Sequence, residues 1–143
     1  MELLDFSLKA GLAVLGGLGI GIEREIRHKS AGLKTNSLVS LGSCVFVLLS
    51  LEFQGESGVD PTRVIGQIVT GIGFIGAGTI LQHGPKVAGL TTAATIWCSA
   101  GVGCLAALGM NRELVVVCLL VVVVNFFFSV AERKIFHKED TDD

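Results

Sequence analysis

The side chains in this sequence that could bind an ion or a partner are concentrated in two charged clusters. The denser cluster is residues 23–29, Glu-Arg-Glu-Ile-Arg-His-Lys, where an apolar segment ends. Glu23 and Glu25 flank Arg24, and Arg27 follows Glu23 by one helical turn, which predicts a salt bridge if a helix continues that far. Such a pair contributes little in open water, but it matters more where it is partly desolvated. The cluster is therefore either a solvated helix end or a functional site.

The second cluster contains Glu52, Glu56, Asp60 and Arg63. Arg63 falls in the first turn of an expected helix, where its charge opposes the helix dipole, so we expect a compensating carboxylate, either Asp60 or Glu52. Magnesium prefers oxygen ligands and is often held by one or two carboxylates plus water. The three acids are therefore candidate ligands, with a hydrated loop as the alternative. We expect no resident cofactor, and Mg²⁺ is the candidate ligand or transported ion.

Patterns typical of enzymes are absent or lack the required context. Residues 71–76 match G-x-G-x-x-G, but they lie inside an apolar segment, and no acidic residue follows at the distance a dinucleotide site needs. The sequence contains no Walker A motif, and its three histidines lack metal-binding spacing. Its four cysteines lie in apolar segments without the paired spacing of a zinc site. We predict no catalytic residues, no enzymatic activity and no nucleic-acid partner.

The composition indicates a membrane protein. Half of the 143 residues are hydrophobic (50%), and only 17% are charged, against about 25% in soluble domains. Five nearly uncharged segments, 6–22, 37–53, 64–81, 90–109 and 114–131, are each long enough to cross the bilayer as a helix. Because they lack strand-like alternation, we predict an all-α polytopic bundle of five transmembrane helices. It comprises a membrane domain at 1–136 and a short charged tail at 137–143.

Lysines and arginines predict the orientation. Eight lie in the loops after the first and third segments and in the tail, and three lie on the other side. The positive-inside rule therefore places the N-terminus outside and the C-terminus in the cytoplasm. Glu2, Asp5 and Lys9 do not fit a signal peptide, so we expect the first segment to remain as a helix. Lys9 and five glycines lower the helix propensity of that segment, and a surface location is the alternative.

Nineteen glycines, most of them in apolar segments, predict close helix packing. The third segment carries a small-residue face at 66, 70, 73 and 77, and the fourth carries a hydroxyl-bearing stripe at 92, 95, 99 and 103. We expect the first, third and fourth helices to pack tightly, with a pore lining as the alternative. The surplus of small faces predicts a homo-oligomer, most simply a dimer. The fifth helix should face lipid, and its Asn125 should bind either a neighbouring helix or a second copy of itself across an interface.

Helix starts are predicted by capping residues. Asp60 before Pro61 offers an N-cap to the third helix, and Thr91 with Thr92 can cap the fourth.

Several motifs in a fixed order resemble the MgtC/SapB family of bacterial inner-membrane proteins. They are Gly-Gly-Leu-Gly-Ile-Gly-Ile-Glu-Arg-Glu at 16–25, Ala-Gly-Leu-Lys-Thr at 31–35 with Leu-Val-Ser-Leu-Gly-Ser at 38–43, Asp-Pro-Thr-Arg-Val at 60–64, the glycine-rich run at 71–78, and Gly-Leu-Thr-Thr-Ala-Ala-Thr-Ile-Trp at 89–97. The resemblance covers about residues 11–109. It implies two roles for the motif residues: some are functional charged groups at the membrane borders, and the others allow close helix packing. The border residues are Glu23, Arg24, Glu25, Asp60 and Arg63, and the packing residues are Gly32, Thr35, Gly71, Gly73, Gly76, Gly78, Thr91, Thr92 and Trp97.

The resemblance also implies a lipid-embedded protein involved in magnesium homeostasis and adaptation to low magnesium and, in pathogens, in survival inside host cells. Its implied mode of action is modulation of other membrane proteins, the F-type ATP synthase among them. The alternative is a small transporter or channel for magnesium or another ion. No acidic residue lies near the centre of a segment, which favours the regulator, although hydroxyl and carbonyl groups could line an ion path. Some longer members carry a soluble C-terminal domain. We expect any regulation that this domain exerts to be absent here or to be supplied by another chain.

Overall fold

Five helices and one short hairpin make up the chain in the computed structural model, which describes residues 1–136 except for the side chains of His83 and of 130–136. The predicted charged tail 137–143 lies outside the described residues. The helices are α1 (Leu3–Ile26), α2 (Leu33–Glu52), α3 (Thr62–Ala77), α4 (Leu90–Ala107) and α5 (Asn111–Phe136). Strands β1 (Leu81–His83) and β2 (Lys86–Ala88) pair antiparallel between α3 and α4. The fold is that of an all-α membrane protein, as predicted.

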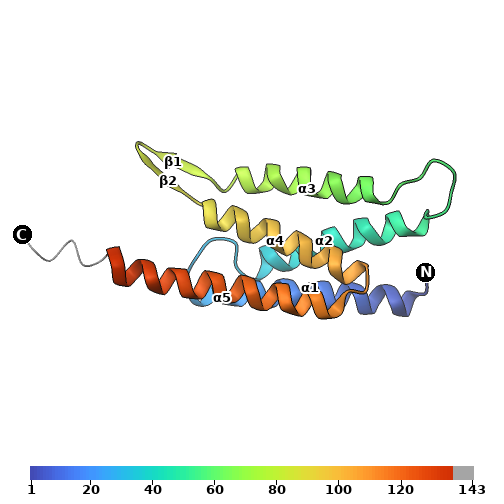
Figure 1. Cartoon of the computed structure of the whole chain (residues 1–143), viewed down its shortest axis with the longest axis horizontal. Helices are drawn as coiled ribbons and strands as arrows, with labels where there is room; N and C mark the ends of the chain where they lie inside the picture. The colour runs from blue at the N-terminus through green and yellow to red at the C-terminus, as the bar shows by residue number, and fades with distance from the viewer. Residues whose placement is uncertain (137–143) are drawn as a thin grey trace, which may run out of the picture.

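Successive helices run up and down, so the loops are gathered at two ends (Figure 1). The hairpin end holds the α1–α2 loop, the β1–β2 hairpin and the first turn of α4. The N-terminal end holds Met1, the α2–α3 loop and the α4–α5 turn. The loops that carry Arg27, Lys29 and Lys86 therefore lie at one end, as the orientation argument requires.

Four helices are long and apolar enough to cross a membrane: α1, α2, α4 and, in α5, residues Asn111–Ser129. α3 has only 16 residues. At 1.5 Å per residue it is about 24 Å long, less than the roughly 30 Å hydrocarbon core. The prediction that this helix continues to residue 81 is wrong. Gly78 ends it, and the chain turns there to pair Leu81 with Ala88 in the hairpin.

The tightest packing joins α2 to α1 and α4 through glycines. A Cβ added at Gly17 of α1 would meet the backbone of Asn36 and Ser37 in α2, and one at Gly103 of α4 would meet the backbone of Ser40. These positions therefore need glycine for the close approach of two backbones. The predicted glycine-rich packing of the first and fourth helices is confirmed, and α2 is the partner of both.

The prediction that α3 packs tightly through its small residues is wrong. Its face at 66, 70, 73 and 77 is exposed, and a Cβ at Gly66, Gly71 or Gly73 would meet nothing. α3 instead contacts α4 through a small apolar cluster that includes Ile72, Ile96 and Ala100. Of the large apolar side chains of α3, Ile72 is buried against α4, whereas Phe74 is 84% exposed.

α5 presents valine, leucine and phenylalanine side chains to the outside, as predicted for a lipid-facing helix. Leu119, Leu120, Phe126, Phe127 and Phe128 are each more than half exposed. Its polar residue Asn125 donates from Nδ2 to Thr95 Oγ1 of α4 at 3.3 Å, which confirms that it binds a neighbour.

Candidate functional site

A polar pocket of about 610 Å³ opens at the hairpin end. The last turn of α1, the α1–α2 loop, the residues around the hairpin, the first turn of α4 and one face of α5 line it. It brings together four of the residues predicted from the sequence: Glu23, Arg24, Thr91 and Thr92.

Arg24 is the central side chain of this pocket and is only 5% exposed. Its Nε and Nη2 donate to the Ser30 carbonyl oxygen at 3.3 and 3.2 Å, and Nη2 also donates to Thr92 Oγ1 at 2.6 Å. One guanidinium thus joins α1, the following loop and α4.

Arg24 does not pair with its neighbour Glu25. Glu25 is exposed, and its Oε2 accepts a hydrogen bond from the Leu33 amide at 3.3 Å. Successive residues on a helix point in different directions, so Arg24 turns into the bundle while Glu25 turns toward the start of α2.

Glu23 and Arg27 form the predicted salt bridge, with Arg27 Nε 3.1 Å from Glu23 Oε1. The Arg27 guanidinium also lies 4.5 Å from the centroid of the Phe126 ring, and Nη2 donates to the Phe126 carbonyl at 3.4 Å. These contacts tie α1 to α5. Glu23 is 7% exposed, and its Oε2 is buried without a hydrogen-bond partner among the described residues. The carboxylate is therefore only half satisfied.

The first turn of α4 starts differently from the prediction. Gly89 is the N-cap, with φ at 91°, and a Cβ there would collide with the Thr79 carbonyl. Thr91 and Thr92 lie inside the helix, so their predicted capping role is wrong: the Thr91 carbonyl accepts from Thr95, and the Thr92 hydroxyl accepts from Arg24. No side chain caps the helix, because a glycine leads into it directly from the hairpin.

The other charged cluster lies at the N-terminal end, away from the pocket. Asp60 Oδ1 accepts hydrogen bonds from the Thr62 amide at 2.9 Å and the Thr62 hydroxyl at 2.7 Å. These bonds lower the pKa of Asp60. Glu52 pairs with the Met1 ammonium at 3.0 Å. Because both acids have other partners, Arg63 forms an ion pair with neither, against expectation.

The structure does not assemble the candidate magnesium ligands. Among residues 1–136, excluding the side chains that are not described, no three His, Cys, Asp or Glu side chains are grouped to hold a metal ion. Glu52 is taken up by the N-terminus, and Glu56 lies exposed in the α2–α3 loop.

The remaining motif residues are spread over the bundle. Gly32 is the N-cap of α2 against Glu25, and the half-buried Thr35 follows it. In α3, Gly76 contacts Ala93 of α4, and Gly78 ends the helix. Gly71 and Gly73 of α3 and Trp97 of α4 are exposed.

Comparison with known proteins gives a consistent assignment. The MgtC family model matches residues 11–134. The chain belongs to the MgtC family. Protein MgtC of Brucella abortus (strain 2308) is 51% identical over 116 residues, which cover 81% of this chain and 48% of that protein. Protein MgtC of Salmonella typhimurium (strain 14028s / SGSC 2262) is 42% identical over 135 residues, 94% of this chain and 57% of that protein.

The chain thus spans about half the length of these MgtC relatives. No solved structure matches it at a significant level.

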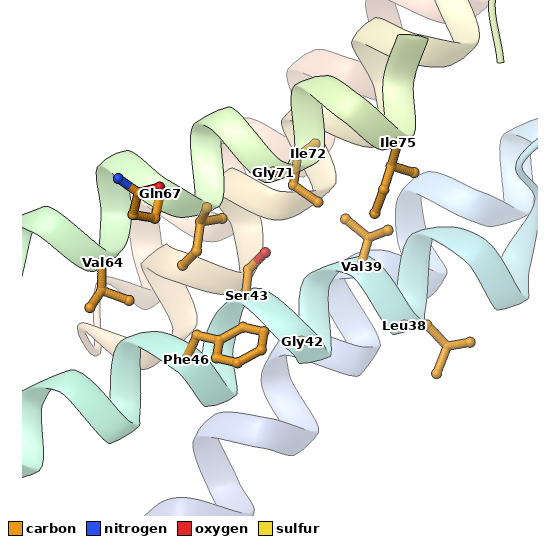
Figure 2. Close-up of a pocket in the computed structure, with 11 residues that line it drawn as sticks. Leu38, Val39, Gly42, Ser43, Phe46, Val64, Gln67, Gly71, Ile72 and Ile75 are labelled. Carbon is orange, nitrogen blue, oxygen red and sulfur yellow. The ribbon is translucent and has the colours of Figure 1, made fainter. Parts of the chain in front are cut away.

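The MgtC-family fold also contains an apolar groove of about 540 Å³ between α2 and α3. Figure 2 shows Phe46 and Val39 of α2 facing Ile72 and Ile75 of α3 across it. The hydroxyl of Ser43 points toward α3. This groove is lined almost entirely by hydrocarbon, which suits lipid chains or another helix rather than a hydrated ion.

A buried polar network that the sequence did not reveal joins the α1–α2 loop, α2 and α4. Asn36 is 0% exposed; its Nδ2 donates to the carbonyls of Ala31 and Gly32, and its Oδ1 accepts from Ser99 Oγ at 2.7 Å. The available signal was an asparagine directly before an apolar segment. Its partner Ser99 lies in the hydroxyl-bearing stripe of the fourth helix, and sequence spacing did not link the two.

Proposed function

We propose that this protein acts in magnesium homeostasis and supports growth at low magnesium by modulating other membrane proteins. The observation that carries the proposal is the distribution of buried polar groups. Among the side chains that the structure describes, the buried polar residues inside the bundle are neutral, for example Asn36, Ser40 and Ser99. The buried charged residues in this part of the chain are Glu23 and Arg24, at the hairpin end. A Mg²⁺ pathway would need oxygen ligands or waters along its length. The described interior offers dense packing instead.

Exposed helix faces supply surfaces for other membrane proteins. α3 leaves its small residues uncovered, and α5 leaves its large apolar residues uncovered. Helices associate in lipid through small residues that let backbones approach closely. The F-type ATP synthase, implied by the family resemblance, is the first partner to test.

The proposed location is the bacterial inner membrane, with the hairpin end in the cytoplasm. This end carries Arg27, Lys29, Lys34 and Lys86, and the positive-inside rule supports the assignment.

The deciding experiment compares growth with ion flux. Expression in a deletion strain should restore growth at low magnesium, while the purified chain in liposomes should give no Mg²⁺ influx above protein-free liposomes. Magnesium influx that scales with the amount of protein would establish the transporter alternative instead. Failure to restore growth at normal abundance would overturn the role in magnesium adaptation.

A further inference from the structure

The first turn of α4 directs unpaired backbone donors into the polar pocket. The amides of Leu90, Thr91 and Thr92 have no hydrogen-bond acceptor among the described residues, and no side chain caps the helix. All three residues line the pocket. The N-terminus of an 18-residue helix carries a partial positive charge, and its free N–H groups favour an anion.

Arg24 adds an independent, fixed cation to the same place. It is 5% exposed and lines the pocket, and its Nε and Nη2 are held by Ser30 and Thr92. Its Nη1 has no hydrogen-bond partner among the described residues. A buried guanidinium with one free edge is oriented in advance for an anion, because its position is already fixed by the other contacts.

The charges of the pocket also favour an anion over a cation. Glu23 already pairs with Arg27, and Arg24 and the exposed Lys29 add two further positive charges to the lining of the pocket. A hydrated Mg²⁺ would face these two cations and find one carboxylate. The buried Oε2 of Glu23 lacks a donor, which a hydroxyl or ammonium group next to the anion could supply.

We infer that this pocket binds a phosphate group. A phosphate presents several acceptor oxygens, enough for the α4 amides, Arg24 and Lys29 together. The polar part is bordered by Leu81, Val124 and Phe128, which would contact acyl chains if the phosphate belonged to a phospholipid. A free phosphate would use the polar part alone. Both sources share the same recognition chemistry, and the inference does not depend on the proposed function.

The test measures binding to the full chain purified in neutral detergent. Three probes are titrated: dioctanoyl phosphatidic acid, dioctanoylglycerol and inorganic phosphate, with bound ligand followed by native mass spectrometry and calorimetry. We expect saturable binding that requires the phosphate, so dioctanoylglycerol should not bind. Binding of phosphatidic acid alone identifies a lipid headgroup site, and binding of inorganic phosphate as well identifies a site for free phosphate. Absence of saturable binding by both phosphate probes would overturn the inference.

Matched variants place the binding in the pocket. Lys29→Gln should weaken phosphate binding about tenfold, because it removes one charged contact. Lys34→Gln removes the same charge at the same end from a residue that does not line the pocket, and it should leave affinity unchanged. Arg24→Lys keeps the positive charge but removes the planar guanidinium with its paired N–H donors. We therefore expect it to lose more phosphate affinity than Lys29→Gln. If Arg24→Lys misfolds, the comparison of Lys29→Gln with Lys34→Gln still tests whether phosphate binds in the pocket. Equal losses in the two lysine variants would show general surface charge and overturn the site.

Discussion

At the scale of single residues, burial separates charged positions that look alike in the sequence. Glu23, Arg24 and Glu25 are neighbours, yet the first two are buried and the third is exposed. Removing one partner of a buried charge leaves the other uncompensated, whereas an exposed charge returns to water. Effects of mutation should therefore follow burial rather than proximity in the sequence.

Arg24→Ala is expected to abolish growth support at low magnesium while the protein still reaches the membrane. The change removes the donor to the Thr92 hydroxyl and the Ser30 carbonyl. It also leaves the buried Glu23 carboxylate without the positive charge of the next residue. Growth of a complemented deletion strain is measured together with protein abundance in the membrane fraction. Lys34→Ala serves as the control because Lys34 is exposed at the same end. Full complementation by Arg24→Ala at normal abundance would show that Arg24 is dispensable.

Asp60 should make the start of α3 sensitive to acid. Hydrogen bonds from Thr62 lower the pKa of Asp60 in the folded chain, so the folded state favours the charged carboxylate. Its contribution is present above the unfolded pKa of about 3.9 and is lost as the pH falls through the lower folded value. Hydrogen exchange at the Thr62 amide should accelerate relative to other α3 amides below about pH 4. In Asp60→Asn this additional acid dependence should disappear, and its persistence would contradict the assignment.

At the scale of elements, glycines of similar sequence context have opposite structural roles. Gly17 faces the backbone of α2, while Gly73 faces open space on α3. A glycine at a crossing allows close approach, whereas an exposed glycine only lowers helix propensity. This difference gives a matched pair of substitutions.

Gly17→Ala should destabilise the protein by about 1–3 kcal/mol, because the new methyl group must push α2 away. Gly73→Ala should leave stability unchanged or raise it slightly, since alanine is the better helix former. Thermal unfolding in detergent measures both. Equal destabilisation of the two variants would indicate that the α3 face is also packed.

At the scale of the whole molecule, the up-and-down arrangement ties orientation to the loops. The α2–α3 loop lies at the opposite end from the basic loops (Figure 1). Any single loop therefore reports the direction in which the entire bundle is inserted.

A reporter that is active only outside the cytoplasm should be active when inserted in the loop at 54–59 and silent when fused after Asp143. This expectation rests on the positive-inside rule, which favours the cytoplasm for the end that is rich in lysine and arginine. The reverse pattern would show the opposite insertion. Activity at both sites would mean that α1 does not span, although its length and hydropathy suit a span.

We also predict a homodimer that uses the exposed small-residue face of α3. Native mass spectrometry in mild detergent should show a dimer, and Gly73→Leu should reduce it without unfolding the monomer, because open space surrounds Gly73 within one chain. The matched control is Gly11→Leu, an equally open glycine on α1. Only monomer in the native chain would count against the prediction.

The sequence by itself determined the elements of this protein, because helices and their spacing are local properties. Apolar length predicted the five helices, the four-residue spacing predicted the Glu23–Arg27 bridge, and composition predicted the lipid-facing surface of α5. Only the tertiary structure decided the site. The hydrogen bond from Arg24 to Thr92 joins positions 68 residues apart, and the end of α3 at Ala77 depends on a hairpin that forms beyond it. Which faces meet is settled by the packing of whole helices, and the spacing within one helix does not contain that information.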